Sequence, residues 1–359
     1  MSATDTPGIG MIGQGFMGKA HAHALITIGH MTGPPAIRPR LVAAAGRNEA
    51  ALGEFAERFG FARHTTDWRK VVEDPEVDVV HVLTPNDLHA EPAIAAARAG
   101  KHVVCEKPLA RDAAEARTML DAVREAGVVH CCAFNYRFVP AVRRARDLIA
   151  SGALGEIRHF RGTYRQSWGA DLAQAGAWRF DAAASGGGAL GDLASHVLDL
   201  ARYLVGDIAS VAAEMATFVP GREVDDAIAA ALRFANGAIG TAEATRFATG
   251  EQNRHTFEVN GSDGWLLFDM ERPGELWVDG RRELTDPEWW WPTGHVLGWE
   301  HTFVFELRRV LDAVAGREPV APHGATFEDG VAAAEACDAV RRSAAEGRRV
   351  TLETTQGAA

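Results

Sequence analysis

The chain has 359 residues, of which 47% are apolar and 24% charged, and a formal net charge of -11. This length predicts two domains, and the composition is typical of a globular protein. The negative charge argues against nucleic-acid and anionic-membrane partners, which need a basic surface. Residues 1–7 lack the features of a signal peptide and no apolar run is long enough to span a membrane, so we expect a cytoplasmic protein.

The first part of the chain alternates strand-like and helix-like segments. Apolar runs expected to be strands cover Ile9–Ile12, Leu41–Ala45, Val77–Leu83, His102–Cys105 and Val128–Phe134. Helical spacing occupies Met17–Ile28, Glu49–Phe59, His89–Ala99 and Ala113–Ala126. Nearly continuous apolar strands separated by helices indicate a parallel sheet covered on both faces. We therefore predict an α/β protein that begins with a doubly wound Rossmann domain over residues 7–130.

The second part, residues 131–355, follows a different pattern. A connecting helix is expected at Arg143–Ala150, and further helices at Leu190–Leu204, Glu300–Ala315 and Glu328–Ala345. Strands are expected at Ile157–Ser167, Ser210–Thr217, Ala227–Phe234, Ala238–Phe247, Thr256–Asn260 and Trp265–Asp269. The segment Arg281–Gly298 shows no periodicity and is expected to be a loop. Strands in succession, joined by Asn-Gly and Asp-Gly turns, predict a mostly antiparallel sheet with helices on one face.

A glycine-rich turn, Gly13-Gln14-Gly15-Phe16-Met17-Gly18, follows the first strand and opens the first helix. In this context Gly13 permits a tight turn, Gly15 lets backbone N–H groups approach a pyrophosphate, and Gly18 allows close helix–strand packing. We therefore expect the five residues Gly13, Gly15, Phe16, Met17 and Gly18 to bind a dinucleotide. The alternative is a glycine turn of purely structural use.

Two further strand ends are expected to reach the cofactor. The second strand ends in Gly46-Arg47; without an acid to bind the ribose hydroxyl of NAD, and with an arginine nearby, NADP is favoured over NAD. Arg47 can equally be a solvated loop cation. The third strand ends in Thr84-Pro85-Asn86, which either contacts the cofactor or forms a turn in which Asn86 or Asp87 caps the next helix.

A lysine and a histidine with a nearby aspartate supply the expected chemistry. Lys107, in Glu106-Lys107-Pro108, follows a strand at the edge where open α/β sheets bind ligands. Asp192 and His196 are four residues apart, so a helix places them on one face. Gly186–Gly188 precede that helix, and three glycines in a row suggest that a ligand approaches the backbone there. Helix capping by Asp192 and a core position for His196 are the structural alternatives.

These motifs, in this order, resemble the glucose–fructose oxidoreductase/inositol dehydrogenase (Gfo/Idh/MocA) family. The similarity extends to His89, Asn135-Tyr136-Arg137 and Trp178-Arg179-Phe180. The strand Tyr164–Trp168 and the segment Gly298–Phe303 resemble a branch that contains levoglucosan and inositol-type dehydrogenases. The resemblance implies a C-terminal domain for substrate binding, with an open sheet that forms homodimer or homotetramer contacts. It also implies catalytic roles for Lys107, Asp192 and His196, and cofactor contacts for His89, Glu106 and Lys107.

We therefore expect an NAD(P)-dependent dehydrogenase that oxidises a secondary alcohol of a cyclic sugar, anhydrosugar or inositol. His196 removes the hydroxyl proton while Lys107 stabilises the negative charge on the oxygen, or the two exchange roles. No metal is needed, and the histidines, including His21 and His23, form no convincing ligand set. Substrate contacts are expected from Asn135, Arg137, Tyr164, Gln166, Trp178, Arg179, Asp192, His196 and the Trp289–Trp291 loop. Arg179 and Arg246 keep an acidic sugar possible.

Two other classes of protein remain open at this stage. An NAD-dependent glycoside hydrolase oxidises its substrate transiently and releases free sugar without accumulating reduced cofactor. A regulator that senses dinucleotides without catalysis can share the fold. The intact set of Lys107, Asp192 and His196 argues against the regulator.

Overall fold

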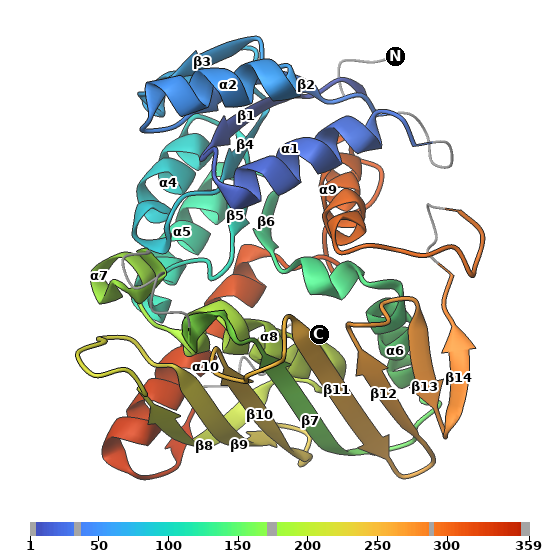
Figure 1. Ribbon diagram of the computed structural model, residues 1–359. Coiled ribbons are helices and arrows are strands. Elements are labelled where there is room, and N and C mark those ends of the chain that lie inside the picture. The colour runs from blue at the N-terminus through green and yellow to red at the C-terminus, as the bar shows by residue number, and fades with distance from the viewer. Residues whose placement is uncertain (1–4, 32–36, 171–177, 287–290, 353–359) are drawn as a thin grey trace.

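The computed structural model describes residues 5–31, 37–170, 178–286 and 291–352. The N-terminal half forms a parallel six-stranded sheet in the order β3-β2-β1-β4-β5-β6 (Figure 1). Its strands are β1 (Gly8–Ile12), β2 (Arg40–Ala45), β3 (Arg63–Thr65), β4 (Val79–Val82), β5 (His102–Glu106) and β6 (His130–Ala133). Its helices are α1 (Phe16–Ile28), α2 (Glu49–Phe59), α3 (Arg69–Val72), α4 (Ala90–Arg98) and α5 (Ala113–Ala126). The predicted Rossmann fold is confirmed; β3 and α3 were not predicted.

The C-terminal half contains a nine-stranded sheet in the order β14-β13-β12-β11-β7-β10-β9-β8-β15. Its strands are β7 (Ile157–Arg165), β8 (Ile208–Ala216), β9 (Ala227–Phe234), β10 (Ile239–Thr245), β11 (Arg254–Gly261), β12 (Trp265–Asp269), β13 (Glu275–Val278), β14 (Arg281–Leu284) and β15 (Val350–Thr351). All neighbours pair antiparallel except β7 with β10. The mostly antiparallel sheet is confirmed. The expected loop Arg281–Gly298 is wrong at its start, because residues 281–284 pair with β13.

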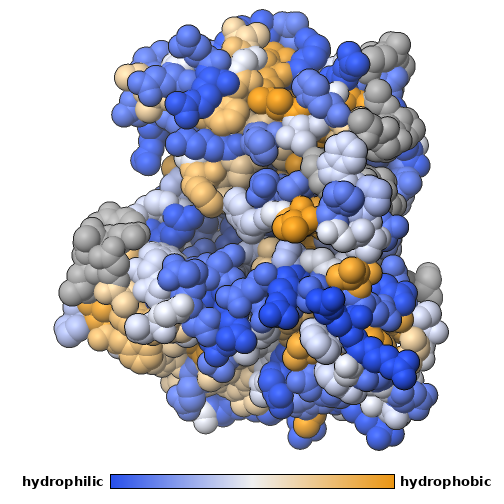
Figure 2. Space-filling view, turned by 45° about the vertical axis from the view of Figure 1, so that its right-hand side comes forward, coloured by the Kyte–Doolittle hydropathy of each residue, from blue (hydrophilic) through white to orange (hydrophobic). Residues whose placement is uncertain are grey.

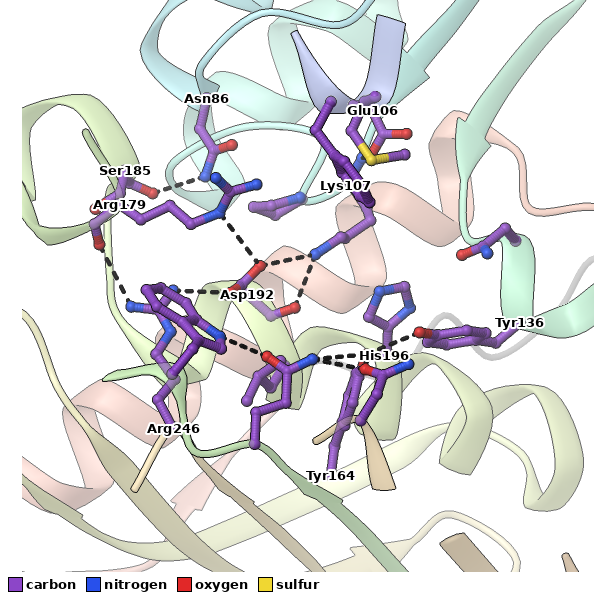
Figure 3. Close-up of a pocket in the computed structure, with 18 of the residues that line it drawn as sticks. Asn86, Glu106, Lys107, Tyr136, Tyr164, Arg179, Ser185, Asp192, His196 and Arg246 are labelled. Atoms are coloured by element: carbon purple, nitrogen blue, oxygen red, sulfur yellow. Dashed lines mark hydrogen bonds and ion pairs between the residues drawn. The ribbon is translucent and has the colours of Figure 1, made fainter. Parts of the chain in front are cut away.

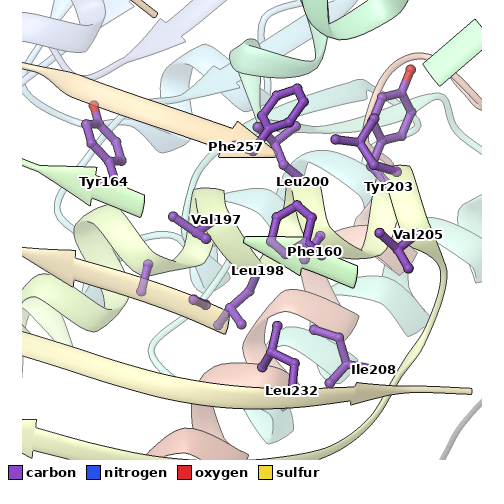
Figure 4. Packing of buried hydrophobic residues seen from close by; sticks show 14 of the residues in the cluster. Phe160, Tyr164, Val197, Leu198, Leu200, Tyr203, Val205, Ile208, Leu232 and Phe257 are labelled. Atoms are coloured by element: carbon purple, nitrogen blue, oxygen red, sulfur yellow. The ribbon is translucent and has the colours of Figure 1, made fainter. Parts of the chain in front are cut away.

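Helices cover one face of this sheet (Figure 1). They are α6 (Pro140–Ala150), α8 (Ser195–Val205) and α10 (Phe327–Glu346). Phe160 and Leu232 of the sheet pack with Val197 and Leu198 of α8 in one buried apolar cluster (Figure 4). Every second residue of β10 points to the opposite face of the sheet, where Ile239, for example, is half exposed. One face of the sheet therefore holds the core and the other faces solvent.

The helix that follows β14 in the chain packs against the Rossmann half of the molecule. Helix α9 (Glu300–Val314) packs against α1. Phe303 and Leu307 of α9 are buried in the same apolar cluster as Leu25 of α1 and Met11 of β1. The core beside β1 is thus completed by residues almost three hundred positions further along the chain.

Among the helices of the described residues, none has both the length and the apolar composition that a membrane span requires.

Candidate active site

A pocket of about 630 Å³ opens between the two halves, and residues from both line it. Figure 2 shows the hollow between the upper and lower parts of the molecule, and Figure 3 shows its interior. The expected site residues that line it are Phe16, Met17, Thr84, Asn86, Glu106, Lys107, Asn135, Tyr164, Gln166, Trp178, Arg179, Asp192 and His196. Segments far apart in sequence therefore converge on one cavity.

The glycine turn has the shape of a dinucleotide cradle. Gly13 has φ +118°, and a Cβ there would lie 2.4 Å from the Leu83 carbonyl oxygen. A Cβ at Gly18 would lie 2.2 Å from the Gly13 oxygen, whereas Gly15 faces open space. Gly15 is the N-cap of α1, and no capping side chain or acidic residue occupies the first turn. The N–H groups of this helix end are therefore free to bind a pyrophosphate, and the residues fit the cofactor.

The expected adenosine end of the site carries an exposed arginine. Arg47 is exposed, and the amide of Gln14 lies over Gly46, where a Cβ would come within 1.4 Å of its Oε1. Phe16 lies at the opposite end of the turn, is 66% exposed and stacks on Trp299 at 5.4 Å between ring centroids.

The segment after β4 forms a contact between the two halves of the molecule. Asn86 donates from Nδ2 to the Ser185 carbonyl oxygen (2.8 Å) and does not cap α4, whose N-cap is His89. His89 is fully buried, with its ring nitrogens 3.0 to 3.2 Å from the carbonyl oxygens of Thr84, Pro108 and Leu109. His89 and Pro85 do not line the pocket. Of the expected cofactor residues here, only Thr84 and Asn86 do.

Lys107 is held firmly at the pocket. It follows β5, and its peptide bond to Pro108 is cis. Its Nζ donates to the backbone oxygen of Asp192 (2.7 Å) and to the carboxylate oxygen Oδ1 (3.2 Å) (Figure 3). Only 15% of its side chain is exposed. The ammonium group is therefore directed at the pocket by a residue from the other half of the molecule.

Asp192 lies among three cations. It belongs to a π-helical turn, η7 (Leu190–Ala194), immediately before α8; such turns are frequent at functional sites. Its Oδ2 lies 3.0 Å from Nη2 of Arg246, and its Oδ1 lies 4.0 Å from Nε of Arg179. Burial alone would raise the pKa of Asp192, but Lys107, Arg246 and Arg179 outweigh it and lower the pKa well below its ordinary range. Asp192 is ionised at any physiological pH.

His196 is a buried, neutral imidazole. It is 5% exposed and packs against Tyr136 at 4.6 Å and Phe134 at 5.6 Å. Within the part of the chain that the structure describes, its ring nitrogens form no hydrogen bond, so one is available to a ligand. Burial and the charge of Lys107 lower its pKa well below the usual value. A neutral imidazole of this kind can accept a proton.

The glycine run Gly186–Gly188 has a different cause from the one we expected. A Cβ at Gly188 would lie 1.7 Å from the Asp225 carbonyl oxygen, and Gly186 has φ +70° against Arg111. The Asp225 carboxylate accepts from the N–H groups of Gly188 and Leu190, both at 2.7 Å. Only Gly187 lines the pocket. The run is mainly an internal packing requirement, which corrects the expectation of a ligand along all three glycines.

Arg137 is also placed differently from our expectation. It is 2% exposed and forms a two-pronged ion pair with Asp199, at 2.6 and 2.9 Å, and a further one with Asp329 at 3.2 Å. It does not line the pocket. Its guanidinium is fully engaged inside the protein, so the expected substrate contact is corrected to a structural ion pair. Within the Trp289–Trp291 loop, residues 289 and 290 lie outside the described residues.

Several pocket residues were not predicted as site residues. Tyr136, Asn253 and Trp299 line the cavity, and Arg246 contributes the ion pair to Asp192 rather than a free anion site. Behind Glu106, the buried ring of His21 lies 3.1 Å from its carboxylate and 3.1 Å from His81. Tyr136 and Trp299 stood in quoted motifs, whereas nothing near Asn253 in the sequence marks it.

Comparison with known proteins agrees with this geometry. Residues 8–134 match the profile described as "Oxidoreductase family, NAD-binding Rossmann fold", and residues 142–267 match the "GFO/IDH/MocA C-terminal domain". The chain is 42% identical to levoglucosan dehydrogenase of Pseudarthrobacter phenanthrenivorans, with 94% of this chain and 96% of that protein covered. The chain belongs to the Gfo/Idh/MocA family of oxidoreductases.

Other members of the Gfo/Idh/MocA family are similar over the full length. A structure of levoglucosan dehydrogenase in complex with NADH and levoglucosan superposes with a TM-score of 0.93 at 43% identity, covering 97% of this chain and all of that one. Myo-inositol 2-dehydrogenase of Thermotoga maritima is 30% identical, with 97% of this chain and 99% of that protein covered. The resemblance read from the motifs is confirmed, and the chain is an NAD-binding oxidoreductase that acts on CH–OH groups.

Proposed function

We propose that this protein is a dehydrogenase for a secondary alcohol of a cyclic sugar, anhydrosugar or inositol. The observation that carries the proposal is the convergence of Lys107, Asp192 and His196 on one pocket beside the glycine cradle. The similarity to levoglucosan dehydrogenase supports a sugar or anhydrosugar substrate. The similarity to an inositol dehydrogenase supports a cyclic polyol as well. The pocket also favours an uncharged ring, because Arg246 is already paired with Asp192.

The proposed mechanism divides the work among three side chains. When bound, the nicotinamide supplies the hydride acceptor. His196 is neutral and removes the hydroxyl proton, while Lys107 donates a hydrogen bond to the same oxygen and stabilises its developing negative charge. Asp192 holds Lys107 in place, and Glu106 accepts a hydrogen bond from the backbone N–H of Lys107 (3.1 Å). Asn135, Tyr164, Gln166, Trp178 and Arg179 are proposed to contact the substrate ring.

One screen tests the proposal and separates it from the two alternatives. Reduction of NAD and of NADP is followed by absorbance with inositols, aldoses and anhydrosugars, and the best substrate is repeated with Lys107→Ala. We expect accumulation of reduced cofactor that falls by about 10²- to 10⁴-fold in the variant. Release of free sugar from a glycoside without net reduction would identify the hydrolase instead. Tight dinucleotide binding with no turnover of any substrate would identify the regulator.

We also propose a homodimer or homotetramer that buries the uncovered face of the C-terminal sheet. This face carries small and apolar residues among its polar ones, including Ala229, Ala231 and the half-exposed Ile239. An extended flat surface of this kind is suited to self-association. Light scattering on the eluting protein measures its mass, and Ile239→Lys is expected to shift it toward the monomer.

A further inference from the structure

One wall of the pocket is a continuous row of hydrogen-bonded side chains. Nε1 of Trp168 lies 2.6 Å from Oε1 of Gln166, and Nε2 of Gln166 lies 2.6 Å from Oδ1 of Asn253. The Tyr164 hydroxyl lies 2.7 Å from the same Oδ1 of Asn253. The row ends at Tyr136, whose hydroxyl lies 2.7 Å from that of Tyr164. All five residues line the cavity, and Figure 3 shows the two tyrosines, Tyr164 and Tyr136, at the end of the row.

The chemistry of Trp168 fixes the direction of every bond in this row. An indole N–H can only donate, so Gln166 must turn its carbonyl oxygen toward Trp168 and its NH₂ toward Asn253. Asn253 must then present its carbonyl oxygen, Oδ1, which accepts from Gln166 and also from the Tyr164 hydroxyl. Because that hydroxyl proton is used, Tyr136 donates to the oxygen of Tyr164.

This polarity leaves the wall with a free donor on Asn253 and few free acceptors. Both lone pairs of Asn253 Oδ1 are occupied, and the Tyr164 oxygen already accepts from Tyr136 and, at 3.4 Å, from Gln166. On the side-chain amides of Gln166 and Asn253, the second lone pair of the Gln166 oxygen is the one position left to accept a hydrogen bond. The Tyr136 oxygen is also occupied, because the NH₂ of Asn253 and the indole N–H of Trp299 both donate to it. The second N–H of Asn253 has no hydrogen-bond acceptor among the described residues and lies at the pocket. That N–H group therefore needs an oxygen acceptor from the ligand.

We propose that Asn253 is a specificity-determining residue that selects a ring-ether oxygen, so that the site takes pyranoses or anhydrosugars in preference to cyclitols. An ether oxygen only accepts and satisfies the Asn253 donor without bringing a proton of its own. A hydroxyl in the same position brings an O–H that finds few free acceptors along this wall, and burying it unpaired is unfavourable. The inference rests on the proposed dehydrogenase function and adds the feature of the substrate that is recognised.

The test compares ring ethers with a cyclitol in matched variants. Initial rates of NAD and NADP reduction are measured with 1,6-anhydroglucose, D-glucose and myo-inositol. Asn253→Asp keeps the acceptor for Tyr164 and Gln166 but removes the NH₂, and Asn253→Ser removes the amide without adding charge. Asn236→Asp makes the same chemical change in the distant β9–β10 turn, where Asp-Gly is also a favourable sequence, and serves as control.

We expect kcat/KM of the wild type to be at least about tenfold higher for the better ring ether than for myo-inositol. In both Asn253 variants this ratio should fall by about 10- to 100-fold, mainly through KM, with cofactor binding unchanged by fluorescence titration. A wild type that prefers myo-inositol, or Asn253 variants that keep the wild-type ratio, would overturn the inference and leave the dehydrogenase intact. A wild type that reduces neither cofactor with any of the alcohols would overturn the dehydrogenase proposal itself.

Discussion

The guanidinium group of Arg246 lies 3.0 Å from Oδ2 of Asp192, while Lys107 contacts the other carboxylate oxygen. Arg246 is only 1% exposed and lies over the ring of Trp168 at 4.7 Å. It also donates to the Arg179 carbonyl oxygen at 3.4 Å. Arg246 lines the cavity, and its ion pair with Asp192, which in turn contacts Lys107, makes it a positioning residue.

The first prediction follows from that relationship. Replacing Arg246 with Met keeps much of the volume but removes the charge, so Asp192 can pull Lys107 out of place. We expect kcat to fall by about 10- to 100-fold, equivalent to roughly 1.4 to 3 kcal/mol, with little change in cofactor affinity. Arg246→Lys should recover part of the loss, since it restores charge without the planar stacking group. Equal kcat in the Met variant and the wild type would refute the positioning role.

The second prediction concerns the pH dependence of alcohol oxidation. His196 must be neutral to accept a proton, and burial together with Lys107 lowers its pKa well below 6.5. The acidic limb of the kcat profile should therefore lie well below pH 6.5, with activity level above it. His196→Gln should lower kcat by about 10²- to 10⁴-fold and abolish the limb. An acidic limb centred at or above pH 6.5 would contradict the assignment of His196 as the base.

Acid stability provides a third prediction. Burial lowers the pKa values of His81, His89 and His196, and that of His255 to about 3. Below pH 6.5 the unfolded chain binds protons at these four positions that the folded chain does not, so stability falls as the pH falls. Each histidine contributes up to about 1.4 kcal/mol per pH unit. Tm should therefore drop clearly between pH 7.5 and 5, and His255→Phe should reduce the drop. An unchanged Tm over that range would argue against buried neutral histidines.

A pair of glycine substitutions tests the packing explanation of the glycine run. Gly188→Ala places a methyl group against the Asp225 backbone and should lower the free energy of unfolding by about 3 kcal/mol or more. Gly187→Ala meets only ordinary contacts, the nearest being Arg341 Nη2 at 3.4 Å, and should change stability little. Chemical denaturation of both variants measures the difference. Equal stabilities would mean that Gly188 is not required by packing.

Cofactor preference depends on Arg47, which is exposed at the end of β2. If the protein uses NADP, as the absence of an acid at this strand end predicts, Arg47→Ala should lower kcat/KM for NADP by about tenfold and leave NAD unaffected. The levoglucosan dehydrogenase structures contain NADH, so the two cofactors are compared directly in the wild type. A wild type that prefers NAD and is insensitive to the substitution would refute the NADP prediction.

The sequence predicted those features that depend on neighbouring residues. The alternation of apolar runs with helical segments and the glycine turn predicted the Rossmann sheet, and the helical spacing of Asp192 and His196 predicted that the two lie together. Short strands such as β3 and β14 carry too few residues to show a period. The roles of Arg137 and Arg246 depend on partners 62 and 54 positions away, which no local pattern reveals. Asn253 gains its meaning only from the row of bonds that tertiary folding assembles.

Helix α9 closes the apolar cluster around α1 and β1 although it follows β7 to β14 of the C-terminal sheet in the chain. A fragment cut after β6 would expose the apolar side chains of α1 that Phe303 and Leu307 cover. The cofactor-binding half is thus a spatial unit but not a contiguous stretch of sequence. During synthesis it cannot reach its final packing until the ribosome has delivered more than three hundred residues.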